Sequence, residues 1–262
     1  MTDLLARPLL FVTGKGGVGK TTVAAALALL AAGQGRRTLV CELDAKGDLA
    51  AAYECGPTAF VPKQVAPNLF AMSMDTEASL KEYLTLQLRM PMMARIGPLA
   101  RVFEYVATAA PGVREILTVG KVLYEVRERH YDNVVVDATA SGHIVGQLNA
   151  AQAINELVKV GLIRQQTNWM IELLSDPAVT GLVITVTPEE MPVSETIELA
   201  GRLEQETPVR LAAIVVNRVL PELFGRAEEE LFERLREPAA VAALSAAGGA
   251  DAAPVLEAAR LA

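Results

Sequence analysis

The stretch Gly14-Lys15-Gly16-Gly17-Val18-Gly19-Lys20-Thr21 follows the apolar run PLLFVT at residues 8–13 and precedes an Ala- and Leu-rich helical pattern that continues to about residue 32. It satisfies the pattern GxxxxGK[ST], in which glycines let the backbone curl so that successive N–H groups point at phosphate oxygens. A glycine-rich turn that matches by chance is the alternative. The strand before and the helix after favour a phosphate-binding loop, because the helix directs its positive end to the same oxygens.

The side chains of this loop have separate predicted roles. Lys20 would reach the β- and γ-phosphates of ATP or ADP, and the hydroxyl of Thr21 would ligate Mg²⁺. Thr22 could add a hydroxyl to the α-phosphate. Lys15, directly after the first glycine, is typical of the deviant Walker A class, in which this lysine stabilises the transferring γ-phosphate, generally across a dimer interface. A solvated loop lysine is the alternative.

Acidic residues follow two of the predicted strands. Asp44 comes after the run at residues 37–43, where open parallel sheets bind ligands, and is placed to orient a water for attack on the γ-phosphate. Asp48 is a second candidate, or a cap of the next helix. Asp137 ends the run DNVVVD and would hold the magnesium shell, through water.

Three later residues complete the predicted site. Gly142, after Asp137, could turn its N–H toward the γ-phosphate, whereas we interpret His143 as structural. Asn217 and Arg218 follow the last apolar run, and an Asn amide can both donate to and accept from the edge of adenine. A strand-terminating turn is the alternative for Asn217.

The predicted site has three groups of residues. The predicted catalytic residues are Lys15, Lys20 and Asp44. The predicted nucleotide-binding residues are Gly14, Lys15, Gly16, Gly17, Val18, Gly19, Lys20, Thr21, Thr22, Gly142, Asn217 and Arg218. The predicted magnesium-binding residues are Thr21 and Asp137.

Short apolar runs alternate with longer helical patterns along the chain, which predicts an α/β, doubly wound, mostly parallel sheet. We expect one domain over residues 1–262, with a helical insert at about 76–130 and further helices at about 144–176. The expected strands are residues 8–13, 37–43, 68–73, 132–137, 181–187 and 211–217, the last two of them buried. A helix is expected around residues 195–205, and the tail from residue 221 is predicted to be helical.

Composition limits the classes of protein that fit. The net charge of −7 and the pI near 5.1 argue against a nucleic-acid partner, because phosphate binding requires Lys and Arg concentrated on one face. Cys41 and Cys55 form no CxxC pair, so a reducing cytoplasm is the expected compartment. The most apolar helical pattern, at residues 23–32, is shorter than the roughly 20 residues of a membrane span, so we expect a soluble protein without stable membrane insertion.

Together these residues resemble the ATPase family that includes the arsenite-pump ATPase and the ATPase that targets tail-anchored membrane proteins. The resemblance covers roughly residues 8–220. Its motifs are Gly14–Thr22, Asp44, Ala109–Glu115 (which contains APGVRE), Asp137–His143 (DATASGH), Ser194–Thr196 (SET) and Val215–Arg218 (VVNR). The resemblance implies a magnesium-dependent ATPase that dimerises around two nucleotides, as a homodimer or with a similar ATPase, and handles a protein client. Residues 80–107, with Met90, Met92 and Met93, correspond to the client groove, and ordinary core packing is the alternative.

The sequence also departs from that family. It has no cysteine pair for a zinc clamp and no cysteine trio for arsenite, and Ala45, Ala138 and Ala140 replace the usual switch residues. These changes bear on the rate of hydrolysis more than on binding. Two other functions therefore stay open: a partition or positioning ATPase that acts on DNA or a membrane surface, and a regulatory subunit that binds nucleotide without turnover.

Overall fold

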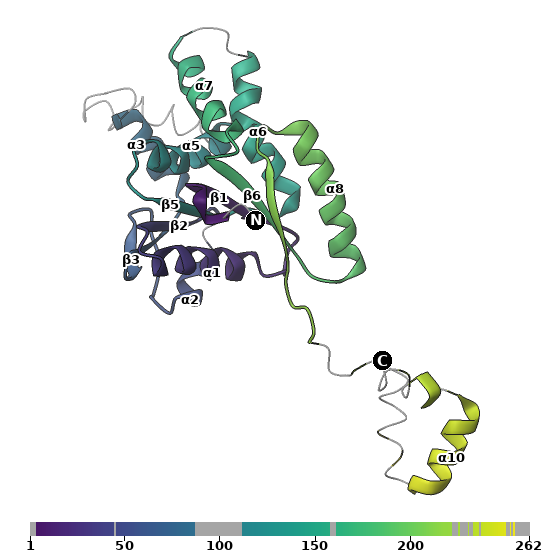
Figure 1. Ribbon diagram of the computed structural model, residues 1–262. Coiled ribbons are helices and arrows are strands. Elements are labelled where there is room, and N and C mark those ends of the chain that lie inside the picture. Colours follow the sequence, from purple (N-terminus) through teal and green to yellow (C-terminus); the bar gives the residue numbers. More distant parts are fainter. Residues whose placement is uncertain are drawn as a thin grey trace. The chain divides into compact units, whose positions relative to one another are not determined.

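The computed structural model describes residues 4–44, 46–86, 112–157 and 161–221 and, in the tail, residues 225, 230, 233–235, 237–249, 252 and 254 (Figure 1). We expected one domain over residues 1–262, but the chain divides into two compact units, Met1–Arg218 and Val219–Ala262. Every described strand belongs to the first unit. The described part of the second unit includes helix α10 (Pro238–Gly248).

The first unit is built on a seven-stranded sheet with the order β3-β4-β2-β5-β1-β6-β7. All neighbouring strands are parallel except β3 and β4, which pair antiparallel. The strands are β1 (Leu9–Thr13), β2 (Thr38–Glu42), β3 (Lys63–Ala66), β4 (Leu69–Ser73), β5 (Asn133–Asp137), β6 (Thr180–Val186) and β7 (Leu211–Val216). The α/β fold with a mostly parallel sheet is thus confirmed.

Helices cover both faces of this sheet (Figure 1). They are η1 (Leu4–Ala6, a 3₁₀ turn), α1 (Lys20–Gly33), α2 (Asp48–Ala52), α3 (Thr76–Leu86), α5 (Val113–Arg127), α6 (Ser141–Leu157), α7 (Leu162–Ser175) and α8 (Glu190–Glu206). Helices α1 and α2 lie on one face, and α5, α6, α7 and α8 lie on the other. The sheet is therefore doubly wound, as predicted.

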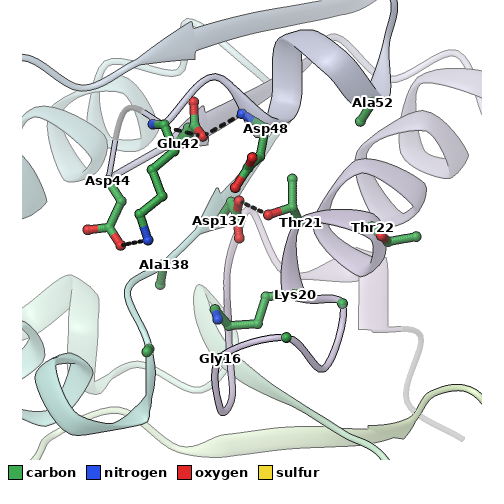
Figure 2. Close-up of a pocket in the computed structure, with 14 residues that line it drawn as sticks. Gly16, Lys20, Thr21, Thr22, Glu42, Asp44, Asp48, Ala52, Asp137 and Ala138 are labelled. Atoms are coloured by element: carbon green, nitrogen blue, oxygen red, sulfur yellow. Dashed lines mark hydrogen bonds and ion pairs between the residues drawn. The ribbon is translucent and has the colours of Figure 1, made fainter.

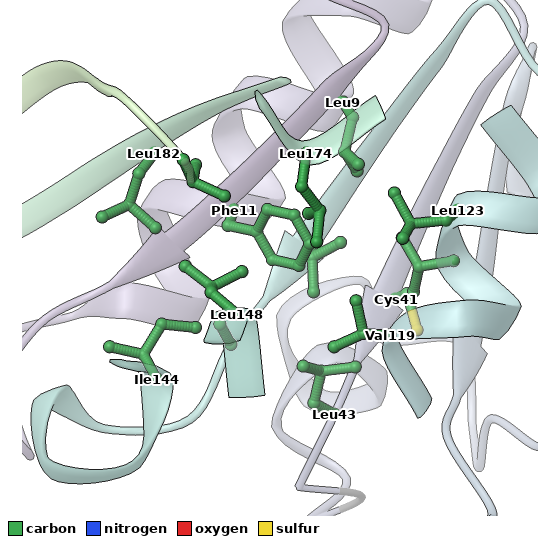
Figure 3. Packing of buried hydrophobic residues seen from close by; sticks show 14 of the residues in the cluster. Leu9, Phe11, Cys41, Leu43, Val119, Leu123, Ile144, Leu148, Leu174 and Leu182 are labelled. Carbon is green, nitrogen blue, oxygen red and sulfur yellow. The ribbon is translucent and has the colours of Figure 1, made fainter. Parts of the chain in front are cut away.

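Alternate residues of the central strands point to these two layers. In β1, Leu9 and Phe11 pack with α5–α8, whereas Leu10 and Val12 pack with the alanines of α1, and all four side chains are fully buried. Figure 3 shows Phe11 enclosed by leucine, valine and isoleucine side chains from several elements. Parallel strands covered on both faces are apolar at every position, which is why these runs were visible in the sequence.

The two edges of the sheet differ from the prediction. Strand β3, of sequence KQVA, was not predicted because it contains no apolar run. Its lysine and glutamine side chains are both exposed. Strand β7 was predicted to be buried, and this was wrong: Ile214 and Val216 are 50% and 52% exposed. The edge strand β7 is as apolar as the central strands of the sheet. Its sequence therefore did not show that it pairs with a neighbour on one side only.

The predicted helical regions are confirmed in part. The insert at residues 76–130 contains α3 and α5, while residues 87–111, which hold most of the predicted client groove, lie outside the described residues. The further helices expected at about 144–176 are α6 and α7, and α6 already begins at Ser141. Across the described parts of the chain, no helix is both long and apolar enough to cross a membrane.

A buried ion network joins α3 to α5. The ammonium of Lys121 lies 2.8 Å from Glu82 of α3 and 2.6 Å from Glu125, and Glu125 also bonds His130 at 2.8 Å. The side chains of Lys121 and Glu125 are each only 7% exposed. Removing one partner of such a pair leaves an uncompensated charge in the protein interior.

We therefore predict that Lys121→Met lowers the free energy of unfolding by about 3 kcal/mol, because Glu125 loses its cation while it stays buried. Chemical denaturation followed by circular dichroism measures this change.

A matched control is Lys81→Met on α3, since Lys81 forms an exposed ion pair with Glu77. We expect this change to cost less than about 1 kcal/mol. Equal losses in the two variants would show that the Lys121 network does not stabilise the fold.

Candidate functional site

The candidate site lies at the carboxyl ends of the parallel strands, where β1, β2 and β5 lead into loops (Figure 2). There a cleft of about 490 Å³ opens between the phosphate loop, the β2–α2 loop and the segment after β5. Its lining residues are Gly16, Gly17, Gly19, Lys20, Thr21, Thr22, Glu42, Asp44, Lys46, Asp48, Ala52, Asp137, Ala138 and Ala140.

Two glycines allow the phosphate loop to pack closely on the sheet. Gly14 has a φ of +148°, and a Cβ there would lie 2.1 Å from the carbonyl oxygen of Thr185 in β6. Gly19 has a φ of +93°, and its Cβ would lie 2.4 Å from Nδ2 of Asn217. Gly14 therefore requires glycine for space as well as for backbone conformation, whereas at Gly19 the backbone conformation requires it and a Cβ would displace the amide of Asn217.

Lys20 stands at the first position of α1 and faces the cleft. Its Nζ donates a hydrogen bond to the carbonyl oxygen of Lys15 at 3.2 Å, across the base of the loop. Partial burial lowers the pKa of Lys20, and the nearby carboxylate of Asp137 opposes that shift. The structure thus places a cation beside the glycine loop, in the lining of the cleft.

Asp137 is the last residue of β5, and Figure 2 shows it facing Thr21. The hydroxyl of Thr21 donates to Oδ2 of Asp137 at 2.6 Å, whereas the buried Oδ1 has no hydrogen-bond partner among the described residues. Burial raises the pKa of Asp137 from its ordinary value of 3.8 to about 6, against the opposing hydrogen bond from Thr21. A hydroxyl beside an unpartnered carboxylate oxygen fits a Mg²⁺ ion that retains several waters.

Lys15 points to another part of the molecule. Its Nζ lies 2.7 Å from Oε1 of Glu195, in the second turn of α8, and the two side chains are about one-third exposed. Lys15 is absent from the lining of the cleft formed by its own loop. Sequence reasoning found the SET motif that contains Glu195 but assigned no partner to that carboxylate.

Glu42 is a site residue that sequence reasoning did not assign. Its carboxylate, 2% exposed, accepts backbone N–H bonds from Lys46, Gly47 and Asp48 at 3.0–3.2 Å and a bond from the hydroxyl of Ser73 at 3.1 Å. The sequence did contain a signal for this role, namely an acid at the end of an otherwise apolar strand. A buried charge needs hydrogen-bond partners, so such an acid is expected to bind nearby groups.

The β2–α2 loop held by Glu42 carries Asp44, which lies in the cleft as predicted. Oδ2 of Asp44 is 3.3 Å from Nζ of Lys46. The alternative that Asp48 caps α2 is wrong, because the N-cap is Gly47 and no side-chain cap bond forms. Asp48 is the first residue of α2 and also lines the cleft.

The remaining predicted residues lie outside the lining of the cleft. Nδ2 of Asn217 donates to the carbonyl oxygen of Val18 at 2.8 Å, so this amide supports the loop from beneath. Arg218, next to it, is exposed and has a φ of +56°. Gly142 belongs to the first turn of α6 rather than to a free loop, since that helix begins at Ser141.

The buried carboxyl of Asp137 predicts a pH-dependent stability in the absence of metal. Its pKa in the folded chain, about 6, exceeds the ordinary 3.8, so the folded state holds the proton more tightly than the unfolded state. The unfolding free energy of the wild type should therefore fall, relative to that of Asp137→Asn, as the pH rises from about 4 to about 7, by about 2 kcal/mol.

Denaturant titrations of both proteins in EDTA at several pH values test this expectation. All other carboxyls are common to the two proteins, so the difference between them isolates Asp137. A difference that does not change with pH would show that the carboxyl ionises as it does in water.

The chain is similar to a known protein family over most of its length. A family model described as anion-transporting ATPase matches residues 7–170 and 153–238. The ATPase BagA of Mycobacterium tuberculosis is 32% identical over 222 residues, which cover 80% of this chain and 64% of BagA. The ATPase GET3 of Podospora anserina is 29% identical over 154 residues, which cover 57% of this chain and 44% of that protein.

The chain thus spans less than two thirds of the length of these relatives. The match of the family model nevertheless includes the phosphate loop, the β2–α2 loop and Asp137, which together form the cleft. The similarity extends over the sheet as well as over the site, so it is more than a shared motif. The chain belongs to the anion-transporting ATPase family.

Proposed function

We propose that this chain binds ATP and ADP with Mg²⁺, hydrolyses ATP, and acts as a dimer of like or unlike subunits that couples its nucleotide state to the handling of a protein client. The observation that carries this proposal is the cleft itself, in which Lys20, Thr21 and Asp137 meet beside the glycine loop (Figure 2). Membership of an ATPase family supports the same conclusion.

Nucleotide binding would rest on the phosphate loop. The N–H groups of Gly14–Thr22 and the positive end of α1 would bind the phosphates, with Lys20 at the β- and γ-phosphates. Thr21 and, through water, Asp137 would hold Mg²⁺, which supplies positive charge to the phosphate oxygens. The hydroxyl of Thr21 and the unpartnered Oδ1 of Asp137 support this assignment.

The adenine would lie near Asn217 and Arg218 at the end of β7. The amide nitrogen of Asn217 is already bonded to Val18, so its oxygen is the atom left to accept from the base amino group. Neither residue lines the cleft, so the base would extend beyond the phosphate-binding part of the site.

Hydrolysis would combine three groups. Asp44, in the cleft, would orient the attacking water, and Lys15 of a second subunit would stabilise the charge on the γ-phosphate. The pairing of Lys15 with Glu195, away from its own cleft, supports a role toward a neighbouring subunit. Gly142, at the N-terminus of α6, would add a backbone N–H on the side of the γ-phosphate.

The proposed client handling rests on the family resemblance, and residues 87–111 lie outside the described residues. A pull-down from cell extract with ATP, compared with a pull-down with ADP, tests it. A client that is retained equally with both nucleotides, or with neither, would contradict coupling to nucleotide state.

We predict that Lys15→Ala keeps its affinity for ATP within a few-fold but lowers kcat by about a thousandfold, since a cation supplied to the transition state acts on chemistry rather than on binding. Lys20→Ala should bind ATP at least about tenfold more weakly, because it loses a charge-assisted bond to the phosphates. Calorimetric titration and steady-state phosphate release measure the two effects.

Lys63→Ala serves as the matched control, because Lys63 lies on the edge strand β3 and does not line the cleft. Wild-type turnover in Lys15→Ala would exclude the proposed role of that lysine. Light scattering with a non-hydrolysable ATP analogue reports on dimer formation, and dimers without turnover in the wild type would instead indicate a regulatory subunit. Salt-sensitive binding to DNA or to anionic vesicles would favour the partition-type alternative.

A further inference from the structure

Lys46 is a cation in the cleft to which none of the preceding roles has been given. It follows Asp44 on the β2–α2 loop and lines the same cleft as Lys20. Its Nζ lies 3.3 Å from Oδ2 of Asp44, and the two side chains are 65% and 40% exposed. The ammonium is therefore accessible to a ligand that enters the cleft.

The backbone at Lys46 is held in place by the buried carboxylate of Glu42. Oε1 of the buried Glu42 accepts the N–H of Lys46 at 3.2 Å and that of Asp48 at 3.0 Å, while Oε2 accepts the N–H of Gly47 at 3.2 Å. Bonds from three consecutive N–H groups to one carboxylate fix the base of this segment. The long side chain of Lys46 can then change its partner without movement of the loop.

Two features of the charge distribution indicate that Lys46 has a second partner. The positive charge of Lys46 contributes to the lowering of the pKa of Lys20, so the two ammonium groups repel each other across the cleft. A bound anion between them would be attracted by both. The ion pair with Asp44 is exposed, and exposed pairs contribute little stability, so a phosphate group can displace the carboxylate at small cost.

We propose that Lys46 binds the terminal phosphate of ATP and leaves Asp44 when it does so. This inference rests on the proposed function, in which Asp44 orients the attacking water. While Lys46 occupies Oδ2 of Asp44, that oxygen is engaged by a cation; the transfer of Lys46 to the γ-phosphate frees it to accept a bond from water. Arrival of the γ-phosphate would thus itself prepare Asp44, and ADP would leave the ion pair in place.

Calorimetric titration of the wild type and of Lys46→Ala, each with Mg-ADP and with a magnesium complex of a non-hydrolysable ATP analogue, tests this inference. We expect Lys46→Ala to bind the analogue roughly tenfold more weakly than the wild type and to bind ADP within about twofold of it, because only the analogue offers the charge-assisted bond. Lys46→Arg should retain most of the affinity for the analogue, since it keeps the charge.

Lys63→Ala, which removes a lysine outside the cleft, should change neither affinity. If Lys46→Ala loses the same affinity for both ligands, or loses affinity for neither, the inference about Lys46 is wrong. The proposed function would still hold in that case, provided that the wild type binds and hydrolyses ATP. Absence of magnesium-dependent binding of either nucleotide to the wild type would overturn both.

Discussion

The parallel pairing of β1 between β5 and β6 is the constraint on which the candidate site depends. Val12 lies beside Asp137, and Thr13 lies beside Ile184, so the chain leaves the sheet next to both neighbouring strand ends. Gly14 then passes so close to the carbonyl of Thr185 that no side chain fits. The close packing of the buried strands therefore determines where the phosphate loop stands relative to the carboxylate of Asp137.

The three carboxylates near the carboxyl ends of β2 and β5 differ in their surroundings, and this gives them different chemistry. Glu42 is buried and saturated by backbone N–H groups, so it acts as a structural anchor. Asp137 is buried with one oxygen bonded and one without a partner, which suits a hydrated cation. Asp44 is exposed and pairs with the exposed ammonium of Lys46, and an exposed pair of this kind contributes little stability.

Much of the cleft was predictable because its residues belong to short motifs with a direct physical purpose. The glycine loop, Lys20, Thr21 and Asp137 each follow or precede an apolar strand, and the structure brings them together as expected. The contacts of Lys15 and Asn217 were not predictable, since Glu195 and Val18 are distant from them in the sequence. A side-chain partner of this kind depends on register and helix orientation, which a local pattern does not contain.

By itself, the sequence determined the alternation of strands and helices, the doubly wound class and the position of the phosphate loop, because burial on both faces of a sheet imposes apolar runs and a phosphate site imposes glycines. Only the tertiary structure decided that β3 and β7 form the edges of the sheet and that Glu42 anchors the β2–α2 loop. It also decided that Lys15 pairs with Glu195 of α8, whereas Lys46 pairs with Asp44 in the cleft. These outcomes follow from packing between segments far apart in the chain, whereas hydrophobic pattern and backbone preference are properties of neighbouring residues.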